Sequence, residues 1–123
     1  MTDRAIIRVP HPDFTPNTVA KVVRGYSMGA IRDGWLVFYE QEFAPPHDGL
    51  HDKLCVVMTS DDRDLVRFVK KGRKPGRYDL LTVTGEPIID AELKWAAEVT
   101  LIKPHVPTDK EAAALWGDQR DGD

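Results

Sequence analysis

The amino-acid sequence predicts a mainly β protein that ends in one short helix. Most apolar segments are only five to seven residues long and rich in β-branched side chains, and Gly, Pro or Asp clusters separate them. This pattern is typical of strands joined by turns. Helical signals are confined to the C-terminal part of the chain, so a single helix is expected there.

Seven segments are expected to be strands. They are residues 5–9, 18–24, 35–41, 53–59, 64–70, 77–83 and 96–102. The acidic turn SDDRD joins the fourth and fifth of them, which predicts a hairpin. HPDFTPN, at 11–17, holds too many prolines for regular structure. TGEPIIDAELKW, at 84–95, is expected to be irregular.

The stretch DKEAAALWG at 109–117 carries the helical signals. Thr108 is a candidate N-cap, because its hydroxyl can accept a hydrogen bond from a free backbone N–H of the first turn. Asp109 and Glu111 suit the positive end of the helix dipole, and Gly117 is a stop signal. The tail DQRDGD beyond it is expected to fray.

Length and composition limit the function classes. A chain of 123 residues fits one domain, which we expect over 1–123, with a core at about 18–104 and a C-terminal helix and tail at 108–123. With 41% hydrophobic and 30% charged residues, it has the composition of a soluble globular protein. No run approaches the roughly 20 apolar residues that cross a bilayer, and no signal-peptide core is present. We expect no membrane association and, by default, a cytoplasmic location.

A net charge of −3 argues against a general nucleic-acid binder, which neutralises phosphates with a basic face. The exception is RFVKKGRKPGR at 67–77, which has six cations and no acid. Its two glycines and proline favour a solvated hairpin loop over a phosphate or partner contact. Direct DNA or RNA binding through it therefore ranks last among the functions considered.

Metal and redox chemistry have little support in the sequence. His47 and His51 have the i, i+4 spacing of metal ligands on a helix, but two preceding prolines and Gly49 favour a loop. Cys55 is the only cysteine and lies in the apolar run KLCVVM, which predicts a buried thiol. We expect no metal and no cofactor.

Ser27 is the strongest candidate for chemistry. It lies in the turn GYSMG between two predicted strands, where a hydroxyl can be exposed while backbone N–H groups near Met28 and Gly29 face a developing oxyanion. A serine hydroxyl is a weak nucleophile until a neighbouring base takes its proton. The base can be a histidine or a lysine kept neutral by burial.

The string GYSMGAIRDGWLVF resembles the active-site turn of the LexA and phage-repressor C-terminal domains, which are self-cleaving Ser/Lys peptidases. That turn reads Gly-Asp-Ser-Met, then a proline and an aliphatic residue, then Asp-Gly-Asp and an apolar strand. DLVRFVKKGRKPGRYDLLTVTGEPI, at 64–88, resembles the family's catalytic-lysine strand and the strand that follows. WAAEVTLIKP, at 95–104, resembles its closing strand. The resemblance covers about 22–104 and implies a LexA-type fold, with twisted antiparallel sheets that form a partly open barrel.

Three departures bear on catalysis. Tyr26 replaces the family's acidic residue, and SMGAI is one residue short and lacks the proline. In the alignment of LVRFV with the lysine strand, Arg67 occupies the lysine position. A guanidinium with a pKa above about 12 stays protonated and cannot accept the Ser27 proton. A shifted register would make Lys70 the base instead, and Arg67 as an ordinary strand residue that points to solvent is a further alternative.

The resemblance implies a regulatory function. Members of the family dimerise through this domain, so we expect a homodimer, or a heterodimer with a related repressor, with a protein regulator as a further partner. No small-residue cleavage pair such as Ala-Gly stands in residues 1–24, and with Arg67 this favours a degenerate dimerisation module in transcriptional control. The alternative is an active self-cleaving peptidase with Ser27 as nucleophile and Lys70 as base.

Overall fold

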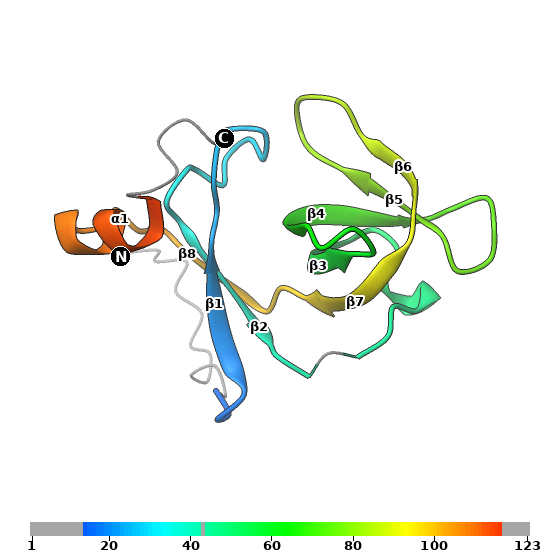
Figure 1. Ribbon diagram of the computed structural model, residues 1–123, viewed down its shortest axis with the longest axis horizontal. Helices are drawn as coiled ribbons and strands as arrows, with labels where there is room; N and C mark the ends of the chain where they lie inside the picture. The colour runs from blue at the N-terminus through cyan, green and yellow to red at the C-terminus, as the bar shows by residue number, and fades with distance from the viewer. Residues whose placement is uncertain (1–13, 43, 117–123) are drawn as a thin grey trace, which may run out of the picture.

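The computed structural model describes residues 14–42 and 44–116, which form two antiparallel sheets and one short helix (Figure 1). The three-stranded sheet has the order β1-β2-β8, with β1 at Thr18–Val22, β2 at Leu36–Glu40 and β8 at Leu101–Lys103. The five-stranded sheet has the order β6-β5-β4-β3-β7. Its strands are β3 (Lys53–Thr59), β4 (Asp64–Lys71), β5 (Tyr78–Leu81), β6 (Ile88–Ala91) and β7 (Leu93–Glu98). The predicted mainly β class is confirmed.

The acidic turn forms the hairpin that the sequence predicts. Strands β3 and β4 pair antiparallel, with Val56 opposite Val66. At the turn, the Asp62 N–H donates to the Thr59 carbonyl oxygen at 2.9 Å, and Asp62 adopts a left-handed φ of 68°. Aspartate tolerates this conformation better than most residues, which explains its place at the turn.

Two expectations for the C-terminal third were wrong. Residues 84–95 are not irregular throughout, since they hold β6 and the first part of β7. Residues 96–102 are not one strand, because the Val99 N–H donates to the Leu54 carbonyl in the five-stranded sheet and the Thr100 N–H donates to the Phe38 carbonyl in the three-stranded sheet. The chain therefore changes sheets between two neighbouring residues. The strand predicted at 5–9 lies outside the described residues.

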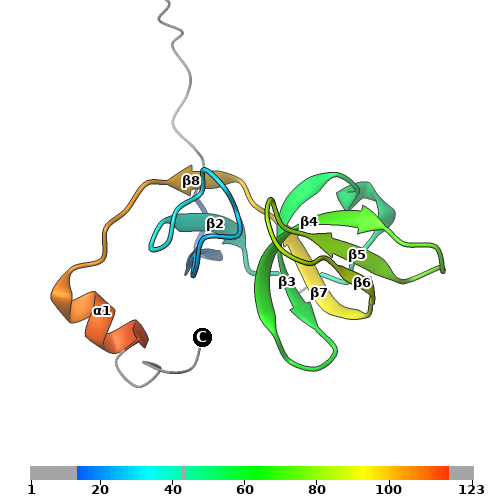
Figure 2. The same ribbon diagram turned by 90° about the horizontal axis from the view of Figure 1, so that it is seen from above.

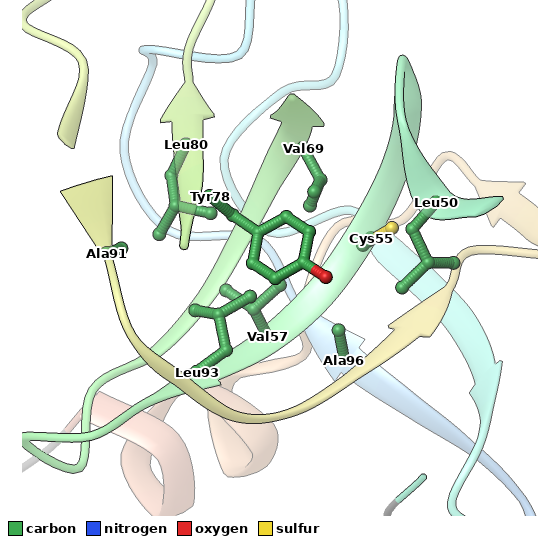
Figure 3. Close-up of a cluster of buried hydrophobic side chains, with 9 residues drawn as sticks. All are labelled: Leu50, Cys55, Val57, Val69, Tyr78, Leu80, Ala91, Leu93 and Ala96. Carbon is green, nitrogen blue, oxygen red and sulfur yellow. The ribbon is translucent and has the colours of Figure 1, made fainter. Parts of the chain in front are cut away.

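The interior strand β3 is buried on both faces, which explains its unbroken apolar run. Cys55 and Val57 belong to a cluster on one face of the five-stranded sheet (Figure 3), and Val56 belongs to a second cluster between the two sheets. The first cluster comprises Leu50, Cys55, Val57, Val69, Tyr78, Leu80, Ala91, Leu93 and Ala96. The second comprises Val23, Val37, Tyr39, Val56 and Val66. This second cluster packs β2 and Val23, the residue after β1, against β3 and β4, and so positions the loop that carries Ser27.

The predicted helix is present as α1 (Asp109–Trp116). Thr108 caps it as expected, because its Oγ1 accepts from the Glu111 N–H at 3.1 Å while Glu111 Oε1 accepts from the Thr108 N–H at 2.8 Å. Figure 2 shows α1 standing away from both sheets. The stop signal Gly117 lies outside the described residues. Within the described part of the chain, no helix has the length and apolar character needed to span a membrane.

Candidate functional site

Ser27 lies in a loop that joins β1 to β2 and is closed at its base by backbone hydrogen bonds. The Val23 N–H donates to the Trp35 carbonyl and the Gly34 N–H donates to the Val23 carbonyl, both at 2.8 Å. Within the loop, Asp33 Oδ1 accepts from the Gly25 N–H at 2.7 Å. The loop therefore has a defined shape that its own polar groups hold in place.

The serine turn is anchored to the segment that follows β5. The Ser27 carbonyl oxygen accepts from the Val83 N–H at 2.8 Å and from the Thr84 N–H at 2.9 Å. Gly29 has a φ of +66°, and a Cβ atom there would lie 3.1 Å from a Val83 methyl group. Met28 is buried with 4% exposure, so its side chain anchors the turn from the inside. The resulting turn holds Ser27 half-buried.

Tyr26, which replaces the acidic residue of the resembled motif, points outward. It is 69% exposed, and the Arg32 guanidinium lies 6.0 Å from its ring centroid. This arrangement is consistent with a weak cation–π contact at the surface. The carboxylate of the resembled motif is thus replaced by an exposed aromatic ring next to the serine.

A cleft of about 520 Å³ lies beside the serine turn, and we call it the serine cleft. One wall is formed by residues 21–25 together with Met28 and Asp33, and the other by residues 64–67 of β4. The two walls are far apart in the sequence. The fold therefore brings Arg67 and the residues that flank Ser27 to the same cleft.

Arg67 is a half-buried cation in this cleft. Its Nη1 donates to the Val66 carbonyl oxygen at 2.8 Å. Burial, reinforced by the nearby Arg63, lowers the pKa of the Arg67 guanidinium below its ordinary value. A guanidinium still stays protonated at physiological pH and offers donors only. On the opposite wall, Lys21 Nζ lies 3.3 Å from Asp64 Oδ1, so this lysine has a carboxylate partner.

Lys70 lies away from the serine cleft. Its side chain is 48% exposed, and its Nζ lies 3.2 Å from Asp52 Oδ1. Lys70 is not among the cleft-lining residues.

The basic segment 67–77 forms the end of the β4–β5 hairpin, and acids from elsewhere in the chain face several of its cations. Lys71 Nζ lies 3.6 Å from Asp48, and Lys74 and Arg77 lie 3.9 and 3.7 Å from Asp90. These exposed pairs are weak in energy, but they offset the positive charge that a phosphate contact would use. The solvated-loop interpretation is therefore favoured over a nucleic-acid contact.

The two histidines with metal-like spacing bind backbone groups. His47 Nδ1 accepts from the Gly49 N–H at 3.2 Å, and His51 Nδ1 accepts from the Lys71 N–H at 2.9 Å. They flank a single 3-10 turn at Asp48–Leu50. Among residues 14–42 and 44–116, no group of three or more His, Cys, Asp or Glu side chains is arranged to hold a metal ion.

Cys55 is buried as predicted, with 0% exposure. Burial, together with the charge of Glu98, raises the pKa of its thiol to about 12. Because the thiolate is the reactive form, this cysteine is unsuited to nucleophilic chemistry near neutral pH.

Neither models of known protein families nor curated protein sequences match this chain. The resemblance described above therefore depends on the residues of 22–104 themselves. Sequence reasoning singled out Ser27 and Arg67 but missed the Lys21–Asp64 pair and the Asp33 contact that shapes the loop. No local signal marks Lys21 and Asp64 as partners, because their contact depends on how the two sheets pack.

Proposed function

We propose that this chain is a degenerate repressor-type Ser/Lys peptidase-like domain that acts as a dimerisation and regulatory module in transcriptional control without cleaving itself. One observation carries the proposal. Gly25 and Met28 of the serine turn line the same cleft as Arg67, while Ser27 itself is not among the lining residues. The resemblance aligns this turn with the nucleophile turn and Arg67 with the base position. A LexA-type fold with two twisted sheets as a partly open barrel is part of the proposal, and the order of serine loop, β4 and closing strand supports it.

The chemistry of the cleft supports recognition without cleavage. A nucleophilic serine needs a neighbour that can accept its proton, and Arg67 cannot do so. Lys21, which also lines the cleft, forms an ion pair with Asp64 at 3.3 Å. Without a base, the Ser27 hydroxyl keeps its proton and does not act as a nucleophile.

Self-association has a candidate surface at the edge of the three-stranded sheet. Strand β8 is an edge strand. Ile102 within β8 is 38% exposed, and Val106, which follows the strand, is 85% exposed. An exposed edge with apolar side chains favours pairing with a second copy. We propose that two chains associate through β8.

Light scattering after size-exclusion chromatography tests this association. The full chain is expected to elute as a dimer at high micromolar concentration. The double variant Ile102→Lys, Val106→Lys should elute as a monomer, because two like-charged side chains would face each other in the interface. Ile89→Lys is the matched control, since Ile89 is 62% exposed on β6 in the other sheet. A wild-type chain that stays monomeric would contradict the dimerisation proposal.

A further inference from the structure

Arg67 differs from its neighbours in having no carboxylate partner among the described residues. Lys21 in the same cleft is paired with Asp64, and the nearby Arg63 is paired with Asp61 at 3.2 Å. The only hydrogen bond that Arg67 makes there is the one from Nη1 to the Val66 carbonyl oxygen. A half-buried cation that lacks an anion is costly, and the cost falls when an anion binds.

The remaining donors of Arg67 are accessible. No buried side-chain nitrogen or oxygen in the described part of the chain lacks a hydrogen-bond partner. The Nε–H and Nη2–H groups of Arg67 have no partner within it, so solvent must reach them. These two groups form the edge of the guanidinium that matches the two oxygens of a carboxylate.

We infer that the serine cleft is a binding site for a carboxylate group on a peptide or protein segment, held by Arg67. The inference deepens the proposed function, on which it rests for the absence of cleavage, by naming the ligand class of the same cleft. The lining supports a carboxylate that is joined to an apolar group, since Val22, Leu65 and Val66 contribute to its walls. A volume of about 520 Å³ accommodates a ligand of a few residues.

The charge of the cleft favours a carboxylate over a phosphate. Lys21 and Asp64 of its walls form an ion pair, so their charges offset each other, and Asp33 adds a further fixed carboxylate. The single charge of a carboxylate is matched by the Arg67 guanidinium, whereas the second charge of a dianion would add repulsion from the Asp33 and Asp64 carboxylates. The same carboxylate chemistry can come from a C-terminus or from an Asp or Glu side chain.

Isothermal titration calorimetry of the full chain distinguishes these sources. The probes are N-acetyl-Ala-Val-Leu with a free C-terminus, the same peptide as its C-terminal amide, and N-acetyl-Ala-Glu-Leu amide, each up to about 5 mM, which covers weak millimolar binding. The free acid is expected to bind about tenfold or more tightly than the amide, the effect of one charge-assisted hydrogen-bonded pair. Comparable binding of the Glu peptide would show that a side-chain carboxylate is also accepted, which supports the inference.

Variants locate the binding. Arg67→Met keeps the length of the apolar stem and should remove the preference for the free acid, while Arg67→Lys keeps the charge and should retain only part of it. Arg73→Gln is the matched control, because it removes one charge from the basic segment outside the cleft. Thermal melts monitored by circular dichroism establish that each variant is folded. A loss of binding heat in a folded variant then reports the loss of the binding site.

The inference would be overturned by equal binding of acid and amide, by unchanged binding to Arg67→Met, or by inorganic phosphate binding more tightly than the free acid. Mass spectrometry of the titrated peptides then shows whether the chain has cleaved them, and so tests the proposed loss of peptidase activity separately from the carboxylate site. Bound and intact peptide supports both, and bound but hydrolysed peptide supports the carboxylate site while contradicting the loss of peptidase activity. Absence of binding and of hydrolysis contradicts the carboxylate site alone.

Discussion

Replacing Gly29 with alanine should destabilise the turn that presents Ser27. Gly29 has a φ of +66°, and an added Cβ would lie 3.1 to 3.3 Å from three side-chain atoms of Val83. The backbone at Val83 also donates to the Ser27 carbonyl oxygen at 2.8 Å. The substitution therefore acts on both the conformation of the turn and the contact that anchors it.

The magnitude follows from two contributions. An L-residue in the left-handed region costs about 1–2 kcal/mol, reduced by a fraction of a kcal/mol because alanine also restricts the unfolded chain. Contacts of 3.1 to 3.3 Å are shorter than the optimum of about 3.5–4.0 Å, but Val83 is 57% exposed and can move. We expect a loss of about 1–2 kcal/mol for Gly29→Ala in the free energy of unfolding, of which strain at the backbone is the larger part.

Gly25→Ala is the matched control. Gly25 has a φ of +84°, but its Cβ would meet no atom within 4 Å, so only the backbone contribution of about 1 kcal/mol should be lost. Urea denaturation followed by tryptophan fluorescence measures the free energy of unfolding of both variants. Gly29→Ala should lower the urea midpoint by about 0.5–1 M for a slope near 2 kcal/mol/M. In a Val83→Ala background, Gly29→Ala should cost no more than Gly25→Ala. The reasoning is refuted if Gly29→Ala is neutral, or if its cost is unchanged in that background.

Other expected outcomes concern the core, the thiol and the helix. Leu80→Ala should lower the free energy of unfolding by about 2–5 kcal/mol because Leu80 is fully buried, while Ile89→Ala at an exposed site should stay within about 0.5 kcal/mol; urea titration compares them. The Cys55 thiol, whose pKa is raised to about 12, should resist iodoacetamide at pH 8.5 until the chain is denatured. The stability that the protonated Cys55 thiol contributes is fully present below the unfolded-state pKa of about 8.5 and should be lost as the pH rises toward the pKa of the folded state. Rapid alkylation of the native chain would contradict the burial of this thiol. Thr108→Ala removes the cap that accepts from Glu111, so hydrogen exchange should show a frayed α1 with an unchanged urea midpoint, and a lowered midpoint would mean that α1 supports the sheets.

Much of the fold could be predicted because alternation and turn residues act locally. The hairpin of β3 and β4 is the clearest case, since Asp62 at its turn favours the left-handed backbone found there. The segment 84–95 could not be predicted in the same way. Asp90 has a φ of 61°, and the pairing of β5 with β6 shifts in register, so the alternation that identifies a strand is interrupted.

The sheet change near Val99 also lies beyond local pattern. AAEVTLI is a plausible single strand by composition, and its division depends on hydrogen bonds to Leu54 on one side and Phe38 on the other. Hydrogen bonds between residues so far apart in the chain leave no recognisable pattern in a short stretch of sequence. Sequence reasoning therefore recovered the strand content of this region but not its assignment to two sheets.

In the candidate site, too, some residues could be predicted from the sequence and others could not. Ser27 could be identified from its turn and Arg67 from its place in the resemblance, because both signals are local in the sequence. The pairing of Lys21 with Asp64 depends on how β1 lies against β4, and the lack of a carboxylate partner for Arg67 within the described residues likewise depends on the tertiary fold. Lys70 could be weighed against Arg67 only as an alternative register, because its partner Asp52 lies in a separate segment of the chain.

Intact mass spectrometry after prolonged incubation tests most directly whether Ser27 lacks a base. The wild-type chain, Ser27→Ala and Arg67→Lys are held at pH 7 and at pH 9–10, the upper range being where a lysine with a pKa of about 10.4 begins to lose its proton. We expect the wild-type chain and Ser27→Ala to keep identical full-length masses, apart from the substitution, at both pH values. Fragments of the wild-type chain that are absent from Ser27→Ala would contradict the proposal that this site recognises a ligand without cleaving itself.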